Sequence, residues 1–129
     1  MNVKTVPPVL TKQAMRFAIS GLLVTGLHVL IATAFIQFVL PAPSLANGVA
    51  FVVATVFSYW INTTWSFSRT LHGRNLVRFC IVSFAGLFLA MFISGVAQDY
   101  GLHYLYGIAF VACIIPPVTF LLHNFWTYR

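Results

Sequence analysis

The chain has 129 residues, of which 60% are hydrophobic and only 6% are charged, and its formal net charge is +6. A soluble domain usually carries about 25% charged residues, so this composition excludes an ordinary soluble globular protein. The positive charge is therefore not a sign of nucleic-acid binding, and no nucleic-acid partner is expected. It suits the inner face of a membrane, where anionic headgroups or a phosphate-bearing lipid would meet it.

The positions of the charges divide the chain into membrane-spanning segments. The seven Lys and Arg residues lie in three short regions, namely Lys4, Lys12 and Arg16, then Arg69, Arg74 and Arg78, and finally Arg129. Between them run long stretches whose only charge is Asp99, and charged side chains are costly in hydrocarbon. An even number of spans puts all three basic regions on one side, which the positive-inside rule assigns to the cytoplasm. Both termini are therefore predicted to be cytoplasmic.

In chain order, the sequence predicts a basic cytoplasmic arm over residues 1–15, irregular or lying on the surface, and a four-span transmembrane domain over residues 16–129. The expected spans cover residues 17–40, 45–67, 79–98 and 102–128. Each reaches roughly the 20 residues that a helix needs to cross the hydrocarbon core. Four such segments cannot close a β-barrel, so the predicted fold class is an all-α, multi-pass protein of the cytoplasmic membrane.

The two halves of the chain resemble each other. Arg16-Phe17 recurs as Arg78-Phe79, 62 residues later, and a shift of 61 residues aligns the ends of the second and fourth spans. On that shift the matched pairs are Ser58 with Thr119, Asn62 with His123, Trp65 with Trp126, Ser66 with Thr127, and Phe67 with Tyr128. The fold is therefore predicted to consist of two parallel helical-hairpin repeats, an arrangement that commonly places a binding site at the repeat interface.

Polar residues in the second and fourth spans form two stripes with a spacing of four, so each stripe shares one helix face. The stripes are Ser58, Asn62 and Ser66, and Thr119, His123 and Thr127. One interpretation is hydrogen bonding between helices, because polar groups in hydrocarbon need partners. The other is a lipid-headgroup site, since Arg binds phosphate bidentately and Asn and His can donate to it. The candidate phosphate- and headgroup-binding residues are Arg16, Arg78, Asn62, His123 and Asn124, and the candidate cavity-lining residues are Ser58, Thr119 and His28.

Aromatic residues lie at the ends of the same spans. Trp65, Trp126, Phe67 and Tyr128 are predicted to anchor the helices at headgroup level. The sequence contains no Cys/His spacing for a metal, no phosphate loop and no pair of carboxylates for acid–base chemistry. We therefore expect no catalytic residue, metal site or cofactor, and we do not expect an enzyme.

Several short motifs are shared with a known family. They are Arg16-Phe17 followed by Ser20-Gly21, the pair Ala46-Asn47, and the sequence SYWINTTWSF over residues 58–67, with a looser second copy over residues 120–128. In these motifs the chain resembles the GtrA-like family of small four-span membrane proteins, over about residues 12–129. The resemblance implies a role in cell-surface polysaccharide synthesis. Such a protein either flips polyprenyl-phosphate-linked sugars or assists the glycosyltransferase that makes them.

Two functions follow as expectations. The first is translocation of a polyprenyl-phosphate-linked sugar through a groove between repeats or between subunits. Four helices enclose little space, so a homo-oligomer, most simply a dimer, is expected. The alternative is a non-transporting adaptor that anchors or regulates a membrane glycosyltransferase through the basic loop at residues 69–78. A proton-coupled exporter is disfavoured, because the first span contains no acidic residue.

Overall fold

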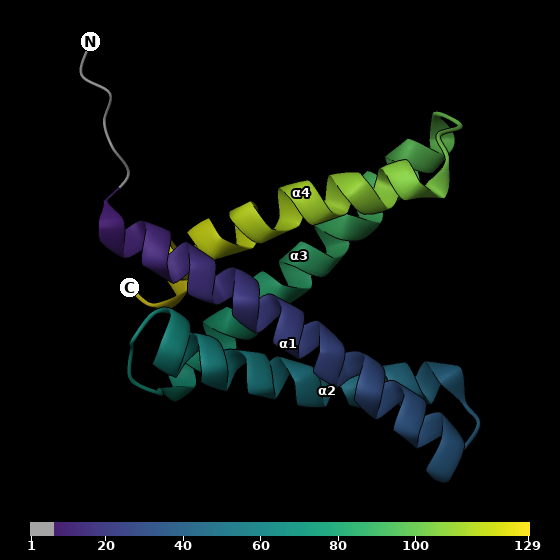
Figure 1. Ribbon diagram of the computed structural model, residues 1–129, viewed down its shortest axis with the longest axis horizontal. Coiled ribbons are helices and arrows are strands. Elements are labelled where there is room, and N and C mark those ends of the chain that lie inside the picture. The colour runs from purple at the N-terminus through teal and green to yellow at the C-terminus, as the bar shows by residue number, and fades with distance from the viewer. Residues whose placement is uncertain (1–6) are drawn as a thin grey trace. The chain divides into compact units, whose positions relative to one another are not determined.

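The regular structure of the described chain is helical throughout. The computed structural model describes residues 7–129, apart from the side chains of residues 43, 44 and 104. Within that range the elements are α1 (Pro8–Phe38), α2 (Pro43–Ile61), η1 (Asn62–Ser66), α3 (Gly73–Asp99), α4 (Tyr104–Leu122) and η2 (His123–Thr127), where η marks a π-helical turn (Figure 1). Four helical segments in this range are long and apolar enough to cross a membrane. This confirms the predicted all-α fold of a multi-pass membrane protein.

Two helices begin earlier than the sequence predicted. α1 begins at Pro8, so residues 8–15 are helical and continuous with the first span rather than irregular. Proline suits the first turn of a helix, because the amide that it lacks would have no acceptor within the helix there. α3 begins at Gly73 rather than near residue 79. The remainder of the predicted arm, residues 1–6 with Lys4, lies outside the described residues.

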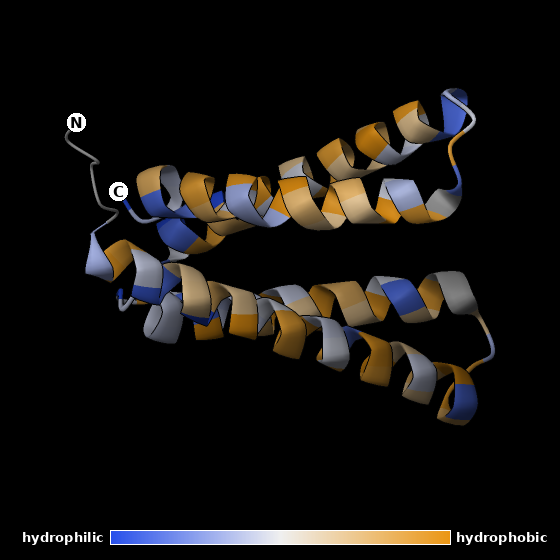
Figure 2. Ribbon diagram, turned by 45° about the horizontal axis from the view of Figure 1, so that its top comes forward, coloured by the Kyte–Doolittle hydropathy of each residue, from blue (hydrophilic) through white to orange (hydrophobic). Residues whose placement is uncertain are grey.

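The chain forms two compact units, each of which is a helical hairpin. The first unit, Met1–Leu71, pairs α1 with α2 and η1, and the second, His72–Arg129, pairs α3 with α4 and η2. Figure 2 shows hydrophobic residues along most of each hairpin and hydrophilic residues near its ends. We call the end of each hairpin that carries Arg16 or Arg78 the basic end. The end where its two helices are connected is the turn end.

The turn of the second hairpin has a defined stop signal. Gly101 has a φ of 70°, in the left-handed region that favours glycine. Its amide donates to the Gln98 carbonyl at 2.9 Å, and the amide of Leu102 donates to the Ala97 carbonyl at 3.1 Å. These are the two bonds of a Schellman motif, which satisfies carbonyls that the end of α3 would otherwise leave open.

Small residues form the seam of each hairpin. In the first hairpin, Ala46, Ala50 and Ala54 are spaced by four on α2 and are all buried. In the second, a Cβ atom placed on Gly86 would lie 3.1 Å from the Thr119 methyl carbon, so α3 and α4 approach closely there. Small residues at a helix contact allow this packing in a bilayer. The large apolar side chains of the same helices remain mostly exposed on the hairpin surface, which suits contact with lipid.

Candidate functional site at the basic ends

Both hairpins end in a π-helical turn at the basic end. The turns cover Asn62–Ser66 and His123–Thr127, which are the positions that the shift of 61 residues aligns. The amide of Phe67 donates to the Asn62 carbonyl at 2.8 Å, and the amide of Tyr128 donates to the His123 carbonyl at 3.2 Å. Single π turns within helices are rare and are frequent at functional sites. The two halves therefore share an uncommon local geometry as well as a sequence pattern.

In the first unit, Asn62 is the centre of a buried hydrogen-bond network, which we call the Asn62 cluster (Ser20, Ser58, Asn62 and Ser66). Its Oδ1 accepts from the hydroxyls of Ser20 on α1 and Ser66, and the Ser66 bond measures 2.7 Å. Its Nδ2 donates to Ser58 Oγ at 3.1 Å. Asn62 is only 2% exposed. The polar stripe on the second span thus joins α1 to α2, as the hydrogen-bonding interpretation expects, and Asn62 leaves little surface for a ligand.

In the second unit, His123 takes the place of Asn62 but is held by stacking. Its ring lies 4.3 Å from the Phe79 ring on α3, at an interplanar angle of 13°. Its Nδ1 lies 3.0 Å from Thr127 Oγ1, and the side chain is 3% exposed. Thr119 donates to the Ile115 carbonyl of its own helix, while its methyl group faces α3 at Gly86. His123 and Thr119 therefore both contribute to the packing of α4 on α3.

Each hairpin also contains an arginine that binds the end of the neighbouring helix. Arg16 Nη1 donates to the Trp65 carbonyl at 2.9 Å, and Arg78 Nη1 donates to the Trp126 carbonyl at the same distance. The guanidinium carbons lie 5.4 Å and 5.3 Å from the centres of the Trp65 and Trp126 rings, respectively. We call these two contacts the Arg–Trp clasps. A cation at this place satisfies carbonyls at a helix C-terminus and gains a cation–π contact.

The clasps use only one side of each guanidinium. A guanidinium has five N–H donors in a planar fork. Within the described residues, the hydrogen bonds of both arginines go through Nη1, including a second bond from Arg78 to the Arg129 carbonyl at 2.9 Å. The edge formed by Nε and Nη2 has no partner in that part of the chain. This edge has the geometry that binds carboxylate or phosphate bidentately.

Asn124, the remaining candidate for headgroup binding, is half-buried beside His123. Its side-chain amide makes no hydrogen bond to any described residue, whereas Thr63, at the matching place of the first unit, is fully buried. Sequence reasoning proposed Asn62, His123 and Asn124 together. The structure separates them, since the first two are packed inside their hairpins and Asn124 keeps its donors available.

A second polar contact lies deeper in the first hairpin. His28 Nε2 on α1 and Asn47 Oδ1 on α2 lie 3.2 Å apart. His28 is 12 residues beyond Arg16, which corresponds to about 18 Å along the helix, so the pair lies within the hydrocarbon region. The aligned positions of the second hairpin hold Ala90 and Ile108. The sequence indicated His28 but not its partner, although Asn47 stands in one of the shared motifs.

The predicted aromatic anchors divide into two kinds. Trp65 and Trp126 are partly exposed and cover the arginines. Phe67 and Tyr128, which were also predicted to anchor at headgroup level, are instead buried. Phe67 packs edge-on against the Phe17 ring at 5.9 Å, because the π turn directs the residue after it back into the hairpin. Among the described residues no group of His, Cys, Asp or Glu is arranged to hold a metal.

The comparisons with known proteins agree with the motifs. The family described as GtrA/DPMS, transmembrane domain, matches residues 16–128. No curated protein and no solved structure matches the chain. The family match includes both Arg–Trp clasps and both π turns. It also covers three of the four described helices that are long enough to span a membrane, and α1 from residue 16 onward. Since it covers most of the sequence, the chain belongs to the GtrA/DPMS transmembrane-domain family.

Proposed function

We propose that the protein translocates a polyprenyl-phosphate-linked sugar across the cytoplasmic membrane, for cell-surface polysaccharide synthesis or glycosylation, without catalysing a covalent step. The observation that carries the proposal is the unpartnered Nε–Nη2 edge of each clasped arginine. Family membership connects the chain with membrane processes of polysaccharide synthesis or glycosylation. It does not specify the transported molecule, which we infer from the chemistry of the basic ends.

A lipid-linked phosphate fits the surroundings of these arginines. The clasp fixes each guanidinium through Nη1 and so leaves the opposite edge preorganised for two phosphate oxygens. Asn124 adds an unpaired amide in the second unit. The exposed apolar faces of the helices suit a long isoprenoid tail. In this proposal Asn62 and His123 position the helix ends that carry the clasps, and the phosphate contacts the arginines.

The same proposal includes an orientation and an assembly. The positive-inside rule predicts that both basic ends face the cytoplasm, where lipid-linked sugars carrying a phosphate would enter. Subunit number follows from native mass spectrometry of the protein released gently from membranes, and a homodimer is expected. A retained polyprenyl-phosphate species in the same spectrum would support the carrier role and give the mass of its sugar.

Replacing the clasped arginines with lysine tests the proposal without removing their charge. The Arg16→Lys and Arg78→Lys variants keep one cation and one carbonyl bond, but a lysine cannot offer a bidentate edge. We expect translocation of a fluorescent polyprenyl-phosphate sugar in reconstituted vesicles to fall at least about tenfold, equivalent to about 1.4 kcal/mol. Arg74→Lys is the matched control, because Arg74 is an exposed residue at the start of α3. Unchanged translocation by the folded double variant would refute the role of the edge.

A non-transporting adaptor is the second candidate, and the basic residues around the start of α3 favour it. Arg69 in the loop before α3 and Arg74 in its first turn are exposed, and their side chains make no hydrogen bond to a described residue. A basic segment of this kind suits docking of an acidic surface on a membrane glycosyltransferase. Scrambling residues 69–74 while keeping Arg78 should then abolish co-purification of that enzyme. Retained co-purification would exclude the loop as the docking element.

A further inference from the structure

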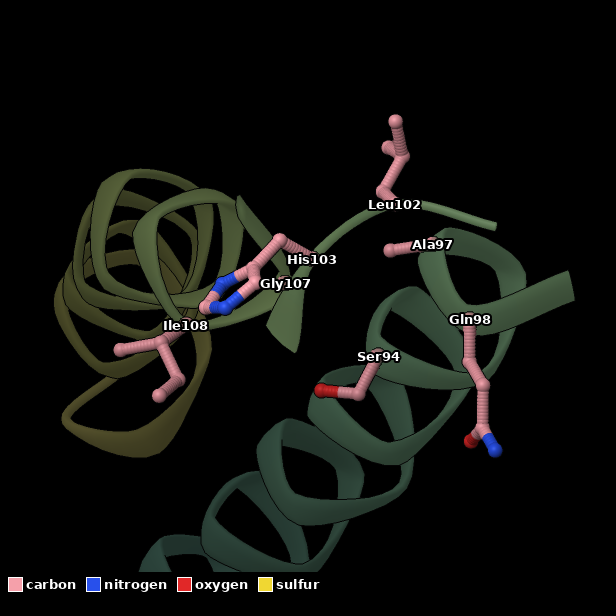
Figure 3. Close-up of a pocket in the computed structure, with 7 residues that line it drawn as sticks. All are labelled: Ser94, Ala97, Gln98, Leu102, His103, Gly107 and Ile108. Carbon is pink, nitrogen blue, oxygen red and sulfur yellow. The ribbon is translucent and has the colours of Figure 1, made fainter. Parts of the chain in front are cut away.

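The turn end of the second hairpin contains a cavity between α3 and α4, far from the Arg78 clasp. It has a volume of about 450 Å³. Its lining residues are Ser94, Ala97, Gln98, Leu102, His103, Gly107 and Ile108 (Figure 3). Gln98 lies 20 residues beyond Arg78 on α3, which corresponds to about 30 Å along the helix. The cavity and the clasp therefore lie at opposite ends of the same hairpin, about one hydrocarbon thickness apart.

Three side chains give the cavity hydrogen-bonding groups. Figure 3 shows the Ser94 hydroxyl directed toward the gap between the two helices, while Gln98 extends away from His103 along α3. Within the described residues, neither the Ser94 hydroxyl nor the Gln98 amide has a hydrogen-bond partner. By contrast, Ser83 on the same helix donates to the Phe79 carbonyl at 2.9 Å. Ser94 thus differs from the common arrangement in which a helical serine satisfies its hydroxyl with the preceding turn.

His103 adds an imidazole whose orientation is fixed. Its Nδ1 accepts a hydrogen bond from the Leu105 amide at 3.3 Å, at the start of α4. A neutral imidazole that accepts at Nδ1 carries its proton on Nε2. The cavity therefore combines a hydroxyl, a carboxamide and an imidazole, which together supply both donors and acceptors.

The charge of the lining selects the kind of ligand. None of the seven lining residues is an acid, a lysine or an arginine. A phosphate or carboxylate would find no cation there, whereas the arginines at the basic end can supply one. Hydroxyl groups match the neutral donors and acceptors, and the aliphatic surfaces of Ala97, Leu102 and Ile108 suit the C–H faces of a sugar ring. The volume also lies within the range of about 300–1,000 Å³ that is usual for ligand sites.

We propose that this cavity is a sugar-binding site, which receives the neutral sugar of the lipid at the turn end of the second hairpin. The inference rests on the proposed function for the origin of the sugar, but not for the binding itself. Because the sugar is bonded to the phosphate, one lipid would occupy the two sites in succession, first the arginines and then, after its headgroup has crossed the membrane, the cavity. The sugar specificity of the protein would depend on Ser94, Gln98 and His103.

Protection of an engineered cysteine tests the proposal in the full-length protein. Ile108→Cys places a thiol on the cavity lining without removing one of its hydrogen-bonding groups. It is introduced with Cys80 and Cys113 replaced by alanine, and its alkylation by a water-soluble maleimide is timed in vesicles. The probes are the methyl glycosides of glucose, galactose, mannose, N-acetylglucosamine and arabinose. At least one should slow alkylation about threefold when its concentration is about twice its Kd. Adding Gln98→Leu should remove the protection while leaving the cysteine reactive.

A control cysteine can be placed at the turn end of the first hairpin. Gln37 lies near the end of α1, one residue after the position aligned with Gln98, and does not line the cavity. Gln37→Cys should be alkylated at the same rate with and without glycosides. The proposal is overturned if no glycoside protects Ile108→Cys, or if Gln37→Cys is protected equally.

The outcome is separable from that of the proposed function. Retention of undecaprenyl phosphate, which has no sugar, is measured on the same preparations and should depend on Arg16 and Arg78 but not on Gln98. Glycoside protection without lipid retention would leave the sugar site standing and remove the phosphate role. Lipid retention without glycoside protection would support the phosphate role of the arginines and overturn the sugar site.

Discussion

At the scale of single residues, the clasped arginines show how a charged side chain can hold a helix end and still keep donors for a ligand. A lysine at position 16 or 78 could donate to the helix-end carbonyl, but its single ammonium group has no second planar edge of donors for a ligand. The guanidinium donates to the tryptophan carbonyl through Nη1 and retains a second edge. The tryptophan ring limits how far this edge can turn. Fixing the donors in this way would lower the entropic cost of binding the proposed phosphate.

The Asn62 cluster makes a prediction about coupling between two helices. Asn62→Ala removes the acceptor of the Ser20 and Ser66 hydroxyls, so it should destabilise the protein by about 1–3 kcal/mol. Ser20→Ala alone removes one bond and should cost less. The double variant should cost clearly less than the sum, because the bond between the two residues is lost only once. Unfolding in mixed micelles measures all three, and strictly additive effects would contradict the network.

At the scale of elements, the sequence predicted the helices well and their ends poorly. Four uncharged segments fixed the number of spans, because the cost of charge in hydrocarbon is large. The sequence did not predict the helical start at Pro8. A Pro-Pro pair usually indicates irregular backbone, but the second proline is compatible with a helix when it occupies the first turn. It did not predict the π turns either. A π turn contains one residue more than an α-helical turn. A spacing of four between polar residues is what an ordinary α-helix also shows, so the pattern does not reveal the extra residue.

The seam between α3 and α4 gives a prediction at the same scale. Gly86→Ala would place a Cβ atom 3.1 Å from the Thr119 methyl carbon, and Thr119 is held by its bond to the Ile115 carbonyl. We expect a destabilisation of about 1–3 kcal/mol from this overpacking. Thr119→Ser keeps the hydroxyl but removes the methyl group, so Gly86→Ala should be nearly neutral in that background. If the cost were the same in both backgrounds, the contact at Gly86 would not be the cause.

At the scale of the whole molecule, each basic end is closed by polar contacts between the two helices of its own hairpin. Arg16 reaches Trp65 and Ser20 reaches Asn62 in the first unit, while Arg78 reaches Trp126 in the second. Sequence alone matched Arg16 with Arg78 through a shift of 62 residues, and Trp65 with Trp126 through a shift of 61, but could not tell which residues touch. Contacts between residues almost 50 positions apart depend on how the hairpin closes. The same limit applies to His28, whose partner Asn47 became evident only from the packing of α1 on α2.

The contacts inside the second unit predict that it can form its hairpin by itself. Cysteines at positions 86 and 119, in a background without Cys80 and Cys113, should form a disulfide because the two side chains face each other across the seam. Residues 72–129 expressed alone should cross-link as efficiently as the full chain, which gel mobility under non-reducing conditions measures. Cross-linking that occurs only in the full chain would show that the second hairpin needs the first.

The likeness of the two basic ends can be tested by converting one into the other. The position aligned with Ser20 is Val82, which is buried and cannot donate a hydrogen bond. His123→Asn alone should therefore destabilise the second hairpin by about 1–3 kcal/mol, because it loses the Phe79 stack and leaves an amide oxygen under-satisfied. Adding Val82→Ser supplies the donor that Ser20 provides in the first hairpin. We expect the double variant to recover at least about 0.5 kcal/mol relative to additivity.

Two controls show whether the donor is the cause. Val82→Thr, which carries the same donor on a β-branched side chain, should recover a similar amount of stability, whereas Val82→Ala should recover none. If serine and alanine behaved alike, the two ends would share a sequence pattern without sharing the contact that gives the pattern its physical meaning.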